Sequence, residues 1–245
     1  MLSVTLLWCG FVQGACGQDL TGATALSLSE VRSEPAAALP ENHWSFQVEP
    51  ASYGHASLTE GSVSAAFAPA WLATVQGTGS ELWTHLDAAV QARWFITPAF
   101  VIGSMASASW SGAAGFPSNV GGSATIHMTM QLDPTWSVAC GLDRLLQVHT
   151  RFQPPARTLR LGVSWKGAVT VASGIDVSQA DGSMFWISAA APVTDNVAIR
   201  GSVSSNPVSL AMATALSTPS IPPILVQVRW VDNLGMKASF ALDLP

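Results

Sequence analysis

The sequence predicts an all-β protein, an antiparallel up-and-down transmembrane β-barrel of roughly 10–14 strands with an irregular N-terminal segment. Short runs in which apolar and polar residues alternate cover most of the chain, and turn-forming residues separate them. The mean hydropathy is +0.34, yet no run approaches the ~18 uninterrupted apolar residues of a membrane helix. Charged residues make up only 10% of the chain, against roughly 25% in an ordinary soluble domain.

The segment GGSATIHMTMQL (121–132) shows the alternation clearly. Even positions from Ala124 to Leu132 are apolar, and odd positions from Ser123 to Gln131 are polar. Successive side chains of a β-strand point to opposite faces, so this strand has one apolar and one polar face. Either a protein core or lipid tails would suit the apolar face.

The chain opens with a segment that is typical of a secretory signal peptide. Residues 1–17 contain an apolar stretch from Leu2 to Val12, and Ala15 to Gly17 supply a small-x-small cleavage site. We expect the mature chain to begin at Gln18. Two alternatives are a lipoprotein acylated on Cys16 and a buried N-terminal strand.

Three further regions follow. Residues 18–42 have mixed polarity and no clear period, which predicts a flexible or loosely packed arm. Residues 43–78 are irregular and rich in small residues, which is consistent with a hatch or plug, or with the first strands. Residues 79–245 predict the barrel, with strands at 81–96, 98–110, 121–132, 134–150, 158–167, 168–178, 183–191, 196–204, 207–217, 223–231 and 234–244.

The polar face of these strands favours a barrel lumen over a water-facing sheet. It consists mostly of Ser, Thr, Gly and Ala, with one or two ionisable groups per strand, whereas a water-facing sheet needs more solubilising charge. Scattered charges of this kind can pair across a lumen. The candidate lumen network comprises Asp87, Arg93, His127, Arg160, Asp176, Arg200, Arg229 and Lys237, with Asp243 as a further acid. A secreted or periplasmic β-sandwich binding module is the alternative, because its strands alternate in the same way.

The tryptophans give a second indication of a membrane. Several lie on the apolar face near strand ends, where the indole ring meets lipid and its N–H meets water. The candidate interface belt comprises Trp94, Trp136, Trp165 and Trp230. Ordinary packing at strand ends would place tryptophans similarly.

No sequence motif indicates catalysis, a metal or a cofactor. The net charge of −5 and the absence of basic clusters argue against nucleic-acid binding. The chain has no H-E-x-x-H, C-x-x-C, P-loop or G-x-S-x-G motif, and its histidines are isolated. Cys140, the one cysteine outside the predicted signal peptide, is expected to be a small hydrophobe. His127 and Thr129 share a polar face, so an outer-membrane lipid-modifying enzyme is the third alternative, although acyl transfer also needs an orienting acid and an oxyanion hole.

Two segments resemble the FadL/PorV/PorQ-like outer-membrane proteins. Residues 53–73 resemble the N-terminal motif that leads into the barrel of that family, with Ala68 where the family has asparagine. Residues 196–216 and 226–244 resemble its closing strands. The residues that carry the resemblance are Ala65, Ala66, Phe67, Pro69, Ala70 and Leu72, then Arg200, Gly201, Asn206, Pro207, Leu234 and Gly235. The last strand also resembles the assembly signal of outer-membrane barrels, with Asn233, Gly235, Ala238 and Phe240.

The resemblance implies a non-enzymatic barrel in the outer membrane of a Gram-negative-type envelope. FadL-type members move hydrophobic molecules, and PorV-type members serve protein secretion and surface attachment. The expected partners are therefore outer-membrane lipid, the barrel assembly machinery, and either a small hydrophobic ligand or a component of a secretion system.

Overall fold

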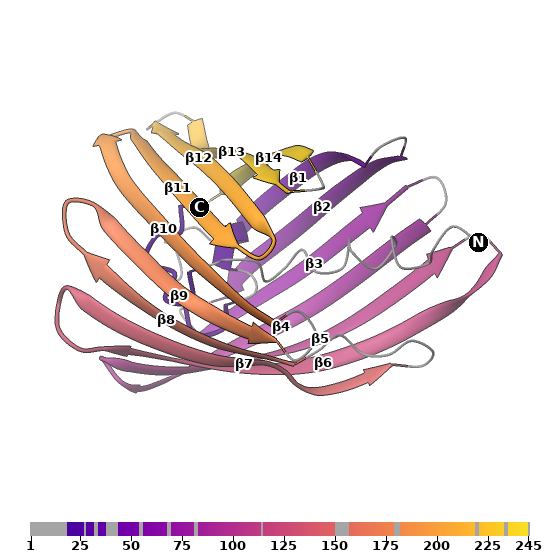
Figure 1. The fold of residues 1–245 in the computed structure, drawn as a ribbon, viewed down its shortest axis with the longest axis horizontal. Helices are drawn as coiled ribbons and strands as arrows, with labels where there is room; N and C mark the ends of the chain where they lie inside the picture. Colours follow the sequence, from indigo (N-terminus) through magenta and orange to yellow (C-terminus); the bar gives the residue numbers. More distant parts are fainter. Residues whose placement is uncertain are drawn as a thin grey trace.

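In the computed structural model, the chain forms one closed antiparallel β-barrel of fourteen strands (Figure 1). The structure describes residues 19–26, 28–31, 34–37, 44–53, 56–67, 70–80, 83–113, 115–149, 157–178, 182–218, 221–232 and 235–244. The signal-peptide prediction for residues 1–17 lies outside these residues. No helix among the described residues is long and apolar enough to cross a membrane.

Each strand pairs with the strands before and after it in the sequence, and β14 closes the barrel against β1. At the closure Trp44 lies opposite Leu244, and Val48 lies opposite Phe240. The strands are β1 (Trp44–Tyr53), β2 (Ala56–Phe67), β3 (Trp71–Gly79), β4 (Trp83–Thr97), β5 (Phe100–Ala113), β6 (Phe116–Gln131), β7 (Trp136–His149), β8 (Thr158–Lys166), β9 (Thr170–Ser178), β10 (Gly182–Thr194), β11 (Val197–Ser205), β12 (Val208–Thr218), β13 (Ile221–Val231) and β14 (Gly235–Leu244).

The predicted fold class is confirmed, and all the strands predicted from residue 81 onward are present as β4 to β14. The barrel itself begins earlier than residue 79. Residues 43–78 supply β1, β2 and β3, so the alternative of first strands holds and that of a hatch or plug does not. Gly, Ser and Ala obscure the alternation of these strands in the sequence, because small residues are compatible with either face.

The apolar faces of the strands form the outside of the barrel. In β6 the side chains of Ile126, Met128 and Met130 are exposed, whereas those of Thr125 and His127 are buried. Large apolar residues on the other strands are exposed in the same alternating way. A β-sandwich would bury these side chains between two sheets. The closed barrel therefore excludes the sandwich alternative.

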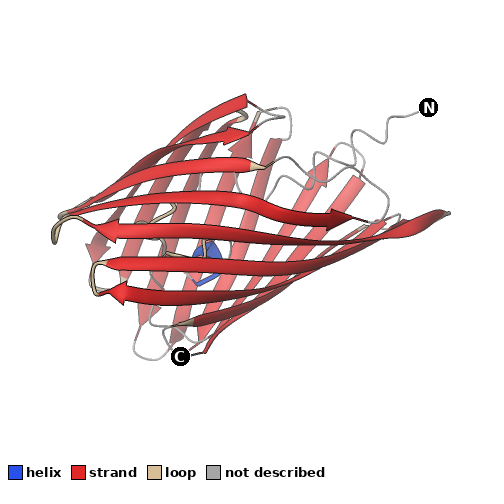
Figure 2. Ribbon diagram, turned by 90° about the horizontal axis from the view of Figure 1, so that it is seen from below, coloured by secondary structure: helices blue, strands red, loops and turns tan. Residues whose placement is uncertain are grey.

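A segment from the N-terminal region lies inside the barrel. We call residues 19–26, 28–31 and 34–37 the inner segment; it includes a short 3-10 helix, Leu28–Val31, which is enclosed by the strands (Figure 2). Leu20, Val31 and Glu34 are almost completely buried. The described residues of this region thus differ from the flexible or loosely packed arm predicted at 18–42, and residues 18, 27, 32–33 and 38–42 lie outside the described residues. The segment can be ordered without an apolar period because the barrel wall encloses it and offers it polar partners.

The β6–β7 connection shows how the turns are built. The carboxylate of Asp133 accepts hydrogen bonds from the Thr135 hydroxyl (2.7 Å) and from the backbone N–H groups of Thr135 (2.7 Å) and Trp136 (2.8 Å). These hydrogen bonds hold the pKa of Asp133 below its usual value. The turn that begins at Asp133 and Pro134 is therefore stabilised by the side chain of its own first residue.

Candidate functional site: a charged cluster across the lumen

The strand register places four of the predicted lumen residues in one row. Going around the wall from β4 to β9, Arg93 lies opposite Gly103, which lies opposite His127. His127 in turn lies opposite Gly141, which lies opposite Arg160, and Arg160 lies opposite Asp176. All of these positions point inward, because residues that are directly opposite on paired strands share a face. The row comprises Arg93, Gly103, His127, Gly141, Arg160 and Asp176.

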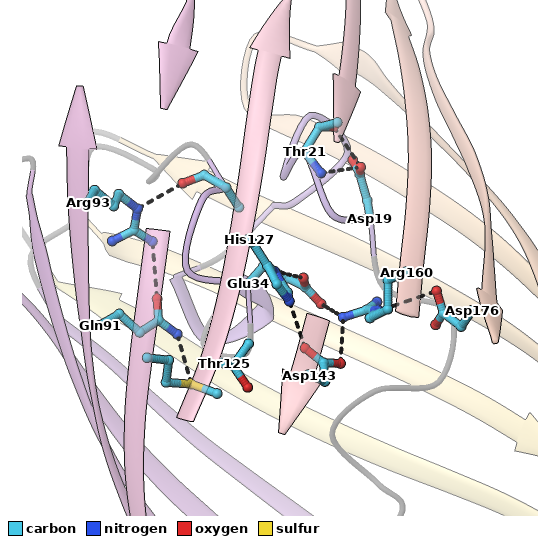
Figure 3. Close-up of polar contacts among 12 residues, drawn as sticks. Asp19, Thr21, Glu34, Gln91, Arg93, Thr125, His127, Asp143, Arg160 and Asp176 are labelled. Atoms are coloured by element: carbon cyan, nitrogen blue, oxygen red, sulfur yellow. Dashed lines mark hydrogen bonds and ion pairs between the residues drawn. The ribbon is translucent and has the colours of Figure 1, made fainter. Parts of the chain in front are cut away.

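The centre of this row, together with two further carboxylates, forms a buried ionic cluster. We call Glu34, His127, Asp143, Arg160 and Asp176 the lumen cluster (Figure 3). Arg160 is fully buried, and its Nη1 lies 2.5 Å from Glu34 Oε1 and 3.7 Å from Asp143 Oδ2. Its Nε lies 3.2 Å from Asp176 Oδ1. One guanidinium is therefore surrounded by three carboxylates.

His127 completes the cluster between two of these acids. Its Nε2 lies 2.7 Å from Asp143 Oδ1, and its Nδ1 lies 3.2 Å from Glu34 Oε2. The side chain is 1% exposed. With both ring nitrogens directed at carboxylates, neither is directed at the hydroxyl of Thr129. This geometry gives no support to the alternative of a His127–Thr129 hydrolase.

Glycines in the wall make space for these groups. A Cβ at Gly141 would lie 2.3 Å from His127 Cδ2, and a Cβ at Gly174 would lie 2.5 Å from the ring of Trp186. Trp186 occupies that space and donates a hydrogen bond from Nε1 to Asp176 Oδ1 (3.2 Å). The small residues on the polar faces thus have a steric role that the composition alone does not show.

The inner segment is tied to the wall at other points as well. Arg93 Nε donates a hydrogen bond to the carbonyl of Ala37 (3.0 Å), and Thr24 shares a hydrogen bond with Ser188 (3.1 Å). Glu30 pairs with Arg200. The segment thus reaches β4, β8, β10 and β11 from a single stretch of chain.

Close packing and small apolar contacts support these ties. A Cβ at Gly103 would lie 2.1 Å from the carbonyl group of Pro35, so only glycine lets the backbone of the inner segment approach the wall there. Val31 and Ala37 pack with Leu72 of β3, and Leu26 packs against the inner faces of β12, β13 and β14.

The other predicted network residues lie away from the lumen cluster. Lys237 pairs with Glu49 of the neighbouring strand β1, at 3.5 Å. Asp87 and Arg229 are half-buried on β4 and β13. Asp243 is buried on β14. The structure therefore brings together Arg160, His127 and Asp176 from the predicted list. The residues just described, Lys237, Asp87, Arg229 and Asp243, lie apart from them.

Sequence reasoning missed two acids of the cluster. Glu34 lies in the region where the sequence predicts a flexible or loosely packed arm, and no local pattern connects it to residues more than 90 positions away. Asp143 falls on the predicted inward face of its strand, which was the available signal. A bulge follows it, where Arg144 has a φ of 56° and the register with β6 shifts. Bulges of this kind redirect neighbouring side chains.

The predicted belt tryptophans lie at two ends of the barrel. We call the end where β1 begins and β14 ends the terminal rim, and the other end the opposite rim. Trp94, Trp136 and Trp165 are exposed at the terminal rim, where Trp136 lies opposite Trp165, and Trp230 is exposed at the opposite rim. Trp44 and Trp71 are further exposed tryptophans of the terminal rim.

The arrangement suits electrostatic attachment of one chain segment to the wall. Among the described residues, no group of His, Cys, Asp and Glu side chains has a geometry that could hold a metal ion. What the cluster holds is Glu34, whose two carboxylate oxygens face Arg160 and His127 from opposite sides. Partnered buried charges are stable only as a set, because removal of one leaves the others uncompensated.

The sequence matches no protein-family model and no curated protein. The fold is similar to solved outer-membrane barrels. The toluene transporter TbuX of Ralstonia pickettii superposes with a TM-score of 0.63 and 11% identity, covering 96% of this chain and 100% of that chain. The toluene transporter TodX of Pseudomonas putida gives 0.55 and 12%, covering 94% and 95%. Omp33 of Acinetobacter baumannii gives 0.56 and 10%, covering 83% and 97%. At these identities the likeness establishes the barrel fold.

Proposed function

We propose that this chain is an outer-membrane channel for small hydrophobic molecules and that the inner segment closes its lumen. The observation that carries the proposal is a stretch of the chain itself held inside a closed barrel by a few side-chain ties. Such a stretch blocks the pore while it is in place and opens it when it moves. The structural likeness to two toluene transporters supports an apolar cargo.

The outer surface supports a membrane location. The exposed apolar side chains cover the strands, and every strand is at least as long as the roughly nine residues that a tilted strand needs to cross the hydrocarbon. Tryptophans at both rims suit the two membrane interfaces. The longest connection between strands, residues 150–157, joins β7 to β8 at the opposite rim. Because outer-membrane barrels have short periplasmic turns, we place the terminal rim on the periplasmic side.

Two of the expected partners follow from this membrane location. Outer-membrane lipid would contact the apolar exterior, and the barrel assembly machinery would insert the chain after removal of the signal peptide.

Uptake by intact cells tests the proposal. Gram-negative cells that express the chain should take up radiolabelled toluene at low external concentration faster than cells that lack it. A variant without residues 19–37 should take it up faster still, because the lumen is no longer closed. Heat-modifiable migration on gels shows whether each variant is folded. Uptake equal to that of cells without the chain, for both folded forms, would contradict a transport function.

A structural or secretion-associated barrel is the second candidate. The lumen cluster favours it, because the ion pairs of Glu34 with His127 of β6 and Arg160 of β8 can also serve as permanent cross-braces. The uptake experiment separates the two functions. A brace predicts that loss of residues 19–37 lowers the stability of the barrel without increasing uptake.

A further inference from the structure

The position of His127 determines which of its forms fits the closed barrel. Carboxylate oxygens face both of its ring nitrogens, Asp143 on Nε2 at 2.7 Å and Glu34 on Nδ1 at 3.2 Å (Figure 3). A neutral imidazole has one N–H and one lone pair, so one of the two carboxylates would face a lone pair. The imidazolium has an N–H on both sides. The geometry therefore suits the charged ring.

The charge balance of the cluster leads to the same conclusion. Without the inner segment, the wall contributes His127, Asp143, Arg160 and Asp176, which sum to zero when His127 is charged. The inner segment then adds the carboxylate of Glu34, whose side chain is 0% exposed. If His127 were neutral, three carboxylates would share a single guanidinium. Repulsion between carboxylates is strong at these distances and in these surroundings.

Among the described residues, His127 is the histidine of the lumen cluster, and the other members are one arginine and three carboxylates. The register partners of His127 on β5 and β7 are Gly103 and Gly141. The charged groups that contact it are Asp143 of β7 and Glu34. Arg160 of β8 and Asp176 of β9 complete the cluster through Asp143, and Arg144 follows Asp143. Arginine stays charged, and histidine is the side chain whose ordinary pKa lies nearest neutral pH. His127 is thus the group of this cluster that is able to change charge near neutral pH.

We propose that closure of the barrel is coupled to a proton on His127, so that the inner segment is held while the ring is charged and released when the ring loses its proton. The closed state binds one proton more than the open state. Raising the pH through the titration of His127 therefore favours release, by at most about tenfold in the open-to-closed ratio per pH unit. The inference rests on the proposed function only in taking the inner segment as the closing element.

A labelling experiment measures release without reference to any cargo. Ala36, which is buried beside Gly103, is replaced by cysteine in a chain whose Cys140 is serine. The rate of reaction with a membrane-impermeant maleimide is measured in lipid vesicles from roughly pH 6 to pH 9. Each rate is divided by that of the same protein unfolded in detergent at the same pH, which removes the titration of the thiol itself.

Three variants make the result specific. In His127→Gln the ring that titrates is gone, so labelling should no longer depend on pH. Glu34→Gln removes the charge that the inner segment contributes to the lumen cluster and leaves the wall intact, so labelling should be fast at all pH values. His85→Gln, on β4 and outside the cluster, is the matched control and should keep the pH dependence of the parent protein.

The outcomes are distinct. A normalised rate that rises at least about fivefold between pH 6 and pH 9 in the parent and in His85→Gln, and stays flat in His127→Gln and Glu34→Gln, supports the coupling. A flat parent profile, or the same rise in folded His127→Gln, overturns it. Because labelling does not require transport, a coupled release without toluene uptake would refute the transport function and leave the proton coupling standing.

Discussion

At the scale of single residues, the interior depends on glycines as much as on charges. His127 can lie between Glu34 and Asp143 only because Gly141 faces it across the strand pair without a side chain. Arg160 is fully buried, and its charge is tolerated because three carboxylates surround it. At this level of the wall, a glycine on one strand therefore leaves room for an ionisable side chain on the neighbouring strand.

Gly141→Ala tests this dependence. The added methyl group would lie 2.3 Å from the imidazole of His127 and force the ring away from Asp143. We expect a loss of about 1–3 kcal/mol in the free energy of unfolding, as for other over-packed interiors. Unfolding in urea, followed by the loss of heat-modifiable gel migration, measures it.

Gly201→Ala is the control, because a Cβ at Gly201 meets nothing within 4 Å. Equal stability of the two variants would show that the ring of His127 moves aside freely.

At the scale of elements, each strand separates two environments by its alternation. In β10 the side chains of Phe185 and Ile187 are exposed on the outside, whereas Met184, Trp186 and Ser188 are buried inside. The same strand therefore supplies an outer surface suited to lipid and a contact with the inner segment, through the Ser188 hydroxyl. The lengths of the strands differ, with 16 residues in β6 and nine in β9.

Arginine substitutions along β10 test the lipid-facing assignment. Ile187 lies in the middle of the strand, and Val193 lies near its end at the terminal rim. Ile187→Arg should destabilise the barrel in lipid vesicles by about 2–4 kcal/mol, whereas Val193→Arg should cost about 0–1 kcal/mol. Denaturant unfolding in vesicles provides the measurement. Equal costs at the two depths would mean that this face does not meet hydrocarbon.

At the scale of the whole molecule, closure between β1 and β14 removes both sheet edges, which would otherwise be open to pairing with other chains. Closure also creates the enclosed lumen, and only within an enclosed lumen can one segment contact β4, β8, β10 and β11 at once.

Cysteine cross-linking tests the closure register. Ser45 lies directly opposite Asp243, whereas Ala241 lies opposite Gln47. In chains with Cys140→Ser, Ser45→Cys with Asp243→Cys should form a disulfide on mild oxidation, because the Cβ atoms of directly opposite residues are closer together than those of residues offset along the strands. Ser45→Cys with Ala241→Cys, offset by two residues, should cross-link at least about fivefold more slowly. The reverse preference would indicate a shifted register.

The sequence by itself determined the fold class, the strands from β4 onward and the orientation of their faces. Alternation with a period of two is a local property of the chain, and it is strong where large apolar residues mark one face, as in 121–132. Local pattern was also sufficient to place Arg160, His127 and Asp176 on the inward faces.

Tertiary structure alone decided that Glu34 joins these residues, that Arg160 and Asp176 lie in one row with His127, and that β1 to β3 belong to the wall. The physical reason is that these relations depend on register and on enclosure. The row is set by strand pairings that accumulate around the barrel. The inner segment is held by its contacts with the surrounding wall, and such contacts impose no periodic pattern on its own sequence.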